Sequence, residues 1–550
     1  MTEATRGSGL RAPFERGFSA ALTVLLLWFI ARLGGLAPFP PESALVAFLS
    51  VIPESIEEPA VQGLGELAGL VGLVVAALIA AVLYGLLGVF YDRYVLRRAG
   101  VLGRLSTLER ALVYSLVPWL VFGVVVLPLA GGSFFGVASG FASPGVAWAF
   151  PLTTLVFQLL WGILLWARMP TPVLNGGSIE AAPRDSGRRT FIERGLVLAG
   201  SAVLVLVSLG SALGALTAEG GVLSEGAPSI LPGSAINTQD APAIFGDPRL
   251  APLVNSEMTS NDSFYRVAID LFDPSVDATA WSLSLSGLVG NPKTYSLSDI
   301  QRLPTVTEYD TFLCVSNLIN GGLISNAEWG GVRLSDLFAD AGGVGLGATY
   351  VVFYSVDGYS VSIPLAKALE QTSILAYEMN GVPLPQRHGY PLRAVIPGLY
   401  GMMSAKWVRR VELRNSVEFG YWQTRGWSND ATVQTVTFVR IPQDGASVSL
   451  SQDDGSVLLG GMAFAGDRGI SKVEVSVDGG SRWEEAVLKP PASALTWVLW
   501  AFSWRPPAPG KYVVYARATD GGGQLQTSTQ ADPYPSGATG YVMSTVNVVA

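Results

Sequence analysis

The sequence predicts a multidomain protein: an N-terminal α-helical transmembrane bundle of five spans, an α+β domain and a C-terminal all-β sandwich. Three observations predict this order. Long apolar runs fill 1–216, short strands mix with helical pieces in 262–430, and β-rich runs separated by turns fill 431–550. The chain has 550 residues, a mean hydropathy of +0.40 and only 14% charged residues, which is typical of a membrane protein with several domains.

Five apolar runs have the length that a spanning helix needs, about 20 mostly apolar residues. The first run is interrupted by Arg32. None of the five shows a strong polar stripe, so helices buried in a soluble domain explain them less well. The expected spans are about 18–36, 64–90, 111–130, 146–167 and 196–216.

Arginine placement predicts the orientation of these spans. The N-terminus is basic, and loops 91–110 and 167–195 are rich in arginine, whereas loops 37–63 and 131–145 contain no Lys or Arg. This alternation predicts a multi-pass protein of the cell membrane, embedded in the lipid bilayer. Its N-terminus would be cytoplasmic and everything after residue 216 extracytoplasmic.

The region after the last apolar run begins with a linker and continues as the α+β domain. Residues 217–261 are rich in Gly, Pro, Ser and Ala and predict a linker with an irregular lead-in. In 262–430, LSDIQRL (297–303) and RLSDLFADAG (333–342) have apolar residues at helical spacing, and TYVVFYSVDG (349–358) alternates like a strand. We therefore expect an α+β domain over 262–430.

The last part of the chain has a different pattern. In 431–550, runs such as KVEVSVDGG and KYVVYARATDGG are rich in β-formers and end in Gly or Asp turns. Such runs at regular spacing predict a β-sandwich.

Cys314 is the only cysteine and His388 the only histidine. One thiolate cannot hold zinc or an iron–sulfur cluster, but it suits a redox metal whose other ligands come from an organic cofactor. Taken alone, Cys314 is also explained as a small buried hydrophobe. One histidine excludes a bis-histidine haem, and the absence of CxxCH excludes a c-type haem. The formal net charge of −8 gives no reason to expect nucleic acid as a partner.

The sequence DTFLCVSNLINGGLISNAEWGGVRL (310–334) resembles the molybdenum-cofactor domain of the sulfite oxidase family. The resemblance continues in order through 375–413, FGYWQTRGW (419–427), 471–486 and 515–526, and so covers roughly 260–550. It implies that Cys314 ligates molybdenum beside the dithiolene of a molybdopterin. It also implies an α+β fold for 262–430, and for 431–550 an immunoglobulin-like module that often serves dimerisation, so we expect a homodimer.

The same resemblance implies which residues contact the cofactor. His388 and Arg393, in RHGYPLR, correspond to pterin and phosphate contacts, and an arginine fork matches a phosphate well. SAKW would complete an anion site, and Asp357 in VDGYS would bond the pterin edge, although a simple turn aspartate explains it nearly as well. The expected site residues are Tyr265, Arg266, Cys314, Asp357, His388, Arg393, Ser404, Ala405 and Lys406.

One stretch departs from the family. Animal and plant sulfite oxidases carry substrate-binding arginines just after the cysteine motif, where this chain reads VSNLINGG. Sulfite as the substrate is therefore doubtful, unless Arg266 or Arg387 replaces those cations. The b-type haem domain of the animal enzymes is not recognisable either, so molybdenum is the only redox centre we expect.

The segment SGRRTFIERG (186–195) resembles a twin-arginine export signal. Ordinary positive-inside charge explains the pattern about equally well. A pterin that is inserted in the cytoplasm must cross the membrane inside a folded domain, and twin-arginine transport carries folded cargo, so the expected cofactor favours export.

The leading hypothesis is therefore a membrane-anchored molybdenum oxidoreductase. It would transfer an oxygen atom to or from a small S- or N-containing substrate and exchange electrons with an external carrier or a membrane redox partner. The second hypothesis is a non-catalytic binding or scaffold protein that retains the fold. A transporter is the least favoured hypothesis, because the apolar runs lack the intramembrane carboxylate and histidine relays that are typical of transporters.

Overall fold

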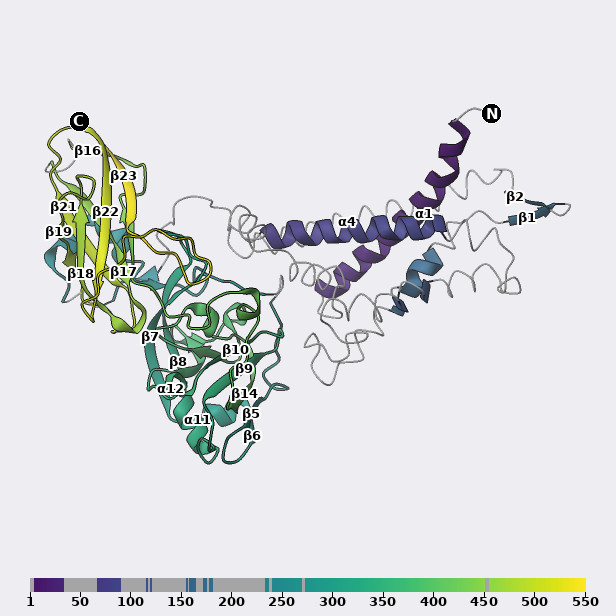
Figure 1. The fold of residues 1–550 in the computed structure, drawn as a ribbon, viewed down its shortest axis with the longest axis horizontal. Coiled ribbons are helices and arrows are strands. Elements are labelled where there is room, and N and C mark those ends of the chain that lie inside the picture. Colours follow the sequence, from purple (N-terminus) through teal and green to yellow (C-terminus); the bar gives the residue numbers. More distant parts are fainter. Residues whose placement is uncertain are drawn as a thin grey trace. The chain divides into compact units, whose positions relative to one another are not determined.

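The computed structural model describes residues 4–33, 67–90, 115–116, 119–120, 155–156, 158–164, 172–175, 178–181, 233–236, 240–269, 273–450 and 455–550. The chain divides into two compact units, Met1–Val222 and Leu223–Ala550. Figure 1 shows the ribbon coloured along the sequence, and the two units are treated separately below.

The first unit contains two long helices that pack on each other, α1 (Ala4–Leu33) and α4 (Leu67–Phe90). They approach closely through glycine: a side chain at Gly17 would lie 3.0 Å from the Cα of Gly88. Ala20, Ala21 and Ala81 are buried in this unit. A short hairpin, β1 (Pro172–Asn175) and β2 (Ser178–Ala181), is also described.

The prediction of a five-span bundle is wrong. Among the described residues, no helix combines the length and apolarity needed to cross a membrane. Composition misleads because a span requires one continuous apolar helix, whereas α1 covers only 18–33 of the predicted run 18–36 and carries Arg32 within it. Of the predicted spans 111–130 and 146–167 only short pieces are described, and 196–216 lies outside the described residues.

The α+β part of the second unit is built on two sheets. The first has the strand order β10-β9-β14-β5-β6, antiparallel except for the parallel pair β14–β5. Its strands are β5 (Leu283–Gly287), β6 (Lys293–Tyr295), β9 (Tyr350–Ser355), β10 (Ser360–Pro364) and β14 (Val408–Arg414). Short helices stand where helical spacing predicted them, α10 (Leu297–Ile300) and α11 (Leu334–Asp340), and α12 (Leu365–Ala368) follows β10.

The second sheet carries the cysteine. Its order is β12-β11-β8-β7, and β13 also pairs with β11. The long hairpin of β7 and β8 runs in register from Thr305↔Val332 to Leu313↔Ile324, so Cys314 begins the loop that joins them. The strands are β7 (Thr305–Leu313), β8 (Ile324–Arg333), β11 (Ile374–Met379), β12 (Val382–Pro383) and β13 (Arg393–Val395).

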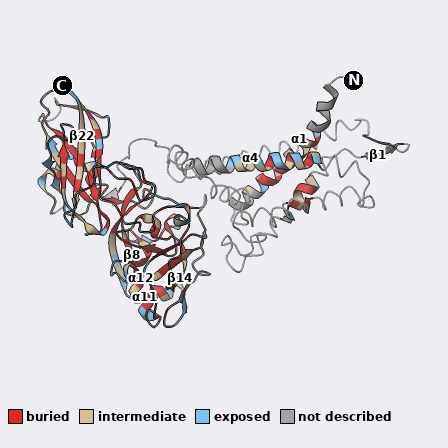
Figure 2. Ribbon diagram, in the orientation of Figure 1, coloured by how far each residue is buried: buried red, intermediate tan, exposed pale blue. Residues whose placement is uncertain are grey.

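The C-terminal part is a sandwich of two sheets, as the β-rich runs predicted. One sheet has the order β15-β17-β21-β20 and the other β16-β23-β22-β18-β19. Their strands are β15 (Val436–Ile441), β16 (Ser447–Ser449), β17 (Val457–Phe464), β18 (Ile470–Ser476), β19 (Glu484–Glu485), β20 (Val487–Leu488), β21 (Val498–Trp504), β22 (Gly510–Asp520) and β23 (Val542–Val549). Figure 2 shows buried residues running along both the sandwich strands and the α+β sheets.

The segment ahead of the α+β domain is tied to the sandwich by a buried ion pair. Within it, β3 (Gly233–Ser234) pairs with β4 (Met258–Thr259), and α9 (Ala251–Val254) buries Leu253. Lys489 Nζ lies 2.8 Å from Glu257 Oε2, and these side chains are 0% and 1% exposed. The structure therefore describes strands and a helix ahead of residue 262, inside the predicted linker 217–261.

The Glu257–Lys489 pair gives a stability test. Lys489→Met should destabilise the unit by about 3–5 kcal/mol in urea denaturation, because it leaves a buried carboxylate without its partner. The double variant Glu257→Gln with Lys489→Met should recover part of that loss. The exposed pair Lys293–Asp340 is the control, and Lys293→Met should cost less than about 1 kcal/mol. Equal effects of the two single variants would contradict this account.

Candidate functional site

Cys314 follows the last residue of β7 and is buried, with 7% of its surface exposed. Its backbone N–H donates to the Leu323 carbonyl (2.9 Å), and its Sγ lies 3.1 Å from Ser316 Oγ. Burial raises the pKa of the Cys314 thiol. The free thiol is therefore protonated near neutral pH, and a bound cation would favour the thiolate.

The loop that carries Cys314 is fixed from two sides. Asn317 Oδ1 accepts from the Leu323 N–H (2.8 Å), which closes the loop on itself. From the sandwich, Arg440 donates to Asn320 Oδ1 (2.7 Å) and to the Gly321 carbonyl (2.9 Å). The sandwich thus helps to set the position of the cysteine loop.

Tyr265 lies beside the end of β7. Its backbone N–H donates to Ser325 Oγ (3.0 Å) on β8. A side chain at Gly401 would collide with the Tyr265 hydroxyl and would lie 3.6 Å from the Leu313 carbonyl oxygen. Burial, with Cys314 adding to it, raises the pKa of Tyr265 well above its ordinary value, so its hydroxyl is neutral. Arg266, next in sequence, forms an ion pair with Asp273 (2.8 Å).

His388 is fully buried and neutral. Its Nε2 lies 2.6 Å from the Asn261 carbonyl oxygen, so Nε2 must donate and Nδ1 remains an acceptor. The ring meets Phe264 edge-on, with centroids 5.5 Å apart. Burial lowers the pKa of His388 to about 3. The imidazole can therefore accept a hydrogen bond from a ligand N–H at physiological pH.

Arg393, on β13, is a buried cation whose partners are neutral. Its guanidinium donates to the carbonyls of His388 (3.1 Å) and Ser404 (3.3 Å), and it stacks 4.8 Å from the Phe312 ring centroid. Its Nε has no hydrogen-bond partner among the described residues. Burial lowers the pKa of Arg393 to about 10, so it stays charged.

The segment Ser404–Lys406 brings a second buried cation to the same place. Ser404 Oγ accepts from the Ile396 N–H (3.1 Å), and the Ala405 carbonyl accepts from the Ala394 N–H (2.8 Å). Lys406 Nζ is buried and, within the described part of the chain, has no hydrogen-bond partner. Burial above all lowers the pKa of Lys406 to about 7. The charge of Asp273 opposes this shift, and the charges of Arg393 and Arg266 add to it.

A single glycine shows how close these groups lie. Gly389 has a φ of +116°, and a Cβ placed on it would be 3.0 Å from Arg393 Cβ and 3.1 Å from Lys406 Cα. Only a residue without a side chain allows this approach. His388, Arg393 and Lys406 are thereby held in one neighbourhood.

Asp357 stands in the turn between β9 and β10. Its Oδ1 accepts from the Tyr359 N–H (3.0 Å), which is the turn role expected of an aspartate. Burial raises the pKa of Asp357 to about 6, and the charge of Lys406 opposes this shift. Asp357 therefore lies close enough to Lys406 for the two charges to interact, at the edge of the cluster formed by His388, Arg393 and Lys406.

This set of donors fits an anionic organic ligand that also supplies ligands to a metal. Arg393 and Lys406 are buried cations whose unpaired N–H groups a phosphate would satisfy. Tyr265 and the cysteine loop lie beside them, so a metal at Cys314 could belong to the same ligand. The structure thus places Tyr265 near Cys314 and Arg393, and it brings Arg393 and Lys406 together around Gly389. Their roles toward a cofactor stay a prediction.

Sequence reasoning missed several neighbours of this site. Phe312 and Trp329 flank the Arg393 guanidinium, and Tyr400 and Tyr359 lie within electrostatic range of Cys314. They resemble ordinary core aromatics in the sequence, because only the sheet in which β11 joins β13 to β8 and β7 brings them to the site. Arg440 also gave no sequence signal, since its role depends on contact between the two domains.

Comparisons with known proteins agree with this chemistry. Residues 271–422 match the family described as oxidoreductase molybdopterin binding domain, and 425–531 match the Mo-co oxidoreductase dimerisation domain. Sulfite oxidase of Arabidopsis thaliana is 32% identical over 285 residues, 44% of this chain and 72% of that protein. An uncharacterized oxidoreductase of Bacillus subtilis, YuiH, is 36% identical over 151 residues, 28% of this chain and 74% of that protein.

Mitochondrial sulfite oxidase of Rattus norvegicus is 32% identical over 326 residues, 51% of this chain. The match covers 59% of the rat protein, less than two thirds of its length.

The buried Lys406 ammonium gives a test by pH. Because its pKa falls from 10.5 to about 7 on folding, the ligand-free protein should gain stability as pH rises from about 7 to about 10.5. Lys406→Met should remove this slope and stabilise the ligand-free protein at pH 7 by about 1–3 kcal/mol. Thermal denaturation across this pH range measures both effects, with Arg302→Met as an exposed control. A variant with the unchanged slope would contradict the burial of this charge.

Proposed function

The chain belongs to the sulfite oxidase family of molybdopterin-dependent oxidoreductases, and we propose that its Leu223–Ala550 unit binds a molybdenum–molybdopterin cofactor and catalyses oxygen-atom transfer. The observation that carries this proposal is the pair of buried cations, Arg393 and Lys406, with unpaired N–H groups in the domain that holds Cys314. The substrate is a small molecule that contains sulfur or nitrogen.

The cofactor, when bound, supplies a metal that exchanges an oxygen atom and an electron pair with the substrate. Cys314 would ligate that metal through its thiolate. Arg393 and Lys406 would hold the phosphate, and Nδ1 of His388 would accept a hydrogen bond from the pterin. Asp357 and Arg266 border this group and influence the charge of Lys406.

The chain's own residues hold the groups around the substrate. The cysteine loop would hold the thiolate in place. Asn317 accepts a hydrogen bond across the loop, and Arg440 of the sandwich donates hydrogen bonds to the loop. Oxidation of a substrate adds one water oxygen and releases two protons and two electrons, and reduction reverses this balance. The electrons would pass to or from an external carrier or a membrane redox partner.

We also propose a homodimer formed through the C-terminal sandwich. The match of residues 425–531 to a dimerisation domain supports this assembly.

We further propose that this unit works outside the cytoplasm. The support is the sequence SGRRTFIERG (186–195), which lies outside the described residues. A domain that folds around its cofactor needs a route for folded cargo, and the arginine pair Arg188–Arg189 would provide the signal.

Cys314→Ser tests the metal ligand. A serine hydroxyl is a much poorer ligand for molybdenum than a thiolate, so turnover should fall at least ~1,000-fold, which corresponds to about 4 kcal/mol. Pterin content, measured by fluorescence after denaturation, should stay near that of the unaltered protein, because the phosphate contacts remain. Unaltered protein purified without molybdenum and pterin would refute the cofactor assignment, and retained turnover would refute the role of Cys314.

Replacing Arg188 and Arg189 by Lys tests the location. Cell fractionation and protease accessibility should find the oxidoreductase unit outside the cytoplasm in the unaltered protein and inside it in the double variant. Arg184→Lys is the matched control, since it lies close by in sequence and leaves the pair intact. Export of the double variant would overturn the proposed route.

A further inference from the structure

A buried carboxyl group on β7 has no part in the cofactor contacts proposed above. Asp310 is 2% exposed, and its Oδ1 has no hydrogen-bond partner among the described residues. A buried polar atom without a partner is rare in folded proteins and calls for a specific explanation, of which a role in catalysis is one.

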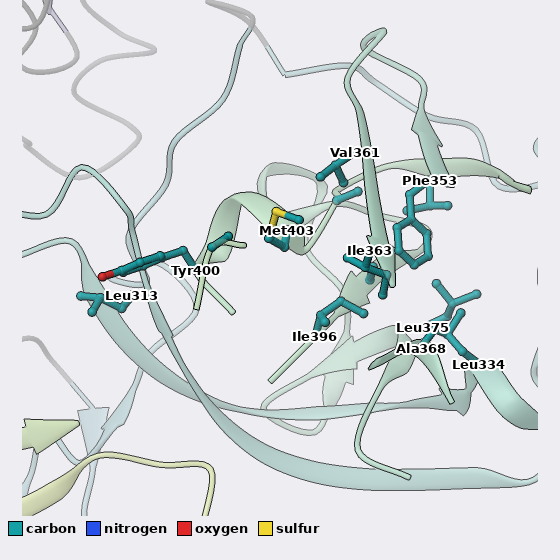
Figure 3. Close-up of a cluster of buried hydrophobic side chains, with 14 of the residues drawn as sticks. Leu313, Leu334, Phe353, Val361, Ile363, Ala368, Leu375, Ile396, Tyr400 and Met403 are labelled. Carbon is teal, nitrogen blue, oxygen red and sulfur yellow. The ribbon is translucent and has the colours of Figure 1, made fainter. Parts of the chain in front are cut away.

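The register of the β7–β8 hairpin places Asp310 beside the Arg393 guanidinium. Side chains alternate between the two faces of a strand, so Asp310 shares its face with Phe312. Leu313 points to the opposite face, into the apolar cluster of Figure 3. The Phe312 and Trp329 rings stack with centroids 5.1 Å apart, and the Arg393 guanidinium lies 4.8 Å and 4.9 Å from those centroids. The Asp310 carboxyl thus stands next to the rings that hold this cation.

Asp310 also interacts electrostatically with the site. Burial lowers the pKa of Arg393, and the charge of Asp310 opposes that shift. Burial raises the pKa of Tyr265, and the charges of Cys314 and Asp310 both add to the rise. The carboxyl is therefore within electrostatic range of the hydroxyl and the guanidinium that surround the proposed metal.

A second set of charges connects Asp310 with solvent. Burial raises the pKa of Asp310 well above its ordinary value, which favours the protonated acid. The charge of Lys367 opposes this shift, and the charges of Glu308 and Asp467 add to it. Lys367 Nζ lies 2.8 Å from Asp467 Oδ2, and the Asp467 side chain is 36% exposed. The buried acid thus has an ion pair that reaches solvent within electrostatic range.

We propose that Asp310 carries protons between the metal site and solvent during oxygen-atom transfer. This inference rests on the proposed function. Oxidation of one substrate molecule takes an oxygen atom from water and releases two protons and two electrons, and the electrons leave to the external carrier or membrane partner. Asp310 passes its proton outward past the Lys367–Asp467 pair, and the carboxylate then accepts one proton released by the reaction. A second cycle moves the second proton, and reduction of a substrate runs the same transfers inward.

Asp310→Asn tests the carrier in the full-length protein, after its molybdenum and pterin content has been matched to that of the unaltered protein. The amide keeps the shape of the neutral acid but cannot exchange a proton. The kcat should fall at least ~100-fold, within the range that a positioned acid or base contributes, and its solvent deuterium isotope effect should change. Turnover is followed with sulfite and an artificial acceptor, and with dimethyl sulfoxide and an artificial donor.

Two further variants separate proton transfer from packing. Asp310→Glu restores a carboxyl and should recover part of the lost kcat. Glu308→Gln, on the same face of the same strand, should leave kcat and the isotope effect near those of the unaltered protein. Asp310→Asn with unchanged kcat and isotope effect would overturn the proposal.

Infrared difference spectroscopy detects the acid without turnover. The loaded, full-length protein is compared in its oxidised and reduced states, set by an electrode. Because reduction of the metal changes the charge near the acid, the difference spectrum should contain a carboxylic acid band that [13C]aspartate shifts and that Asp310→Asn lacks. A loaded, labelled protein without an aspartic acid band refutes the proton carrier alone, even where Asp310→Asn fails to load. Protein purified without molybdenum refutes the proposed function, and this inference with it.

Discussion

Buried positive charge that no carboxylate hydrogen-bonds, in the part of the chain that the structure describes, is the constraint on which this site depends. Arg393 is charged and 5% exposed, and Lys406 Nζ is buried without a hydrogen-bond partner in the part of the chain that is described. Leaving such groups unsatisfied is costly, so their persistence calls for a compensating anion. A phosphate supplies that anion, and the same ligand can then complete the coordination of a metal at Cys314.

The rest of the unit can be understood as support for this arrangement. The β7–β8 hairpin delivers Cys314, and β13 adds Arg393 to the same sheet through its pairing with β11. Gly389 allows the backbone of the His388 turn to approach Lys406. Arg440 then connects the cysteine loop to the sandwich, so the second domain contributes to the position of the thiol.

From the sequence we could predict the site residues that stand out by their residue type. Unique residues such as Cys314 and His388 stand out, and Arg393 and Lys406 lie close in sequence within one motif. Sequence reasoning could not identify the roles of Tyr400 or Arg440, because contacts between segments far apart in the chain leave no local pattern in the sequence. It failed on the transmembrane bundle, because apolar composition cannot show whether one helix continues through a run. In the described part of the chain no helix is long and apolar enough to cross a membrane.

The central claim is that the Cys314 sulfur binds the metal, and X-ray absorption at the molybdenum edge tests it most directly. In the purified, loaded protein the spectrum should show a thiolate sulfur in addition to the dithiolene sulfurs, and in Cys314→Ser this contribution should be lost. Identical sulfur scattering from the two proteins would contradict the account.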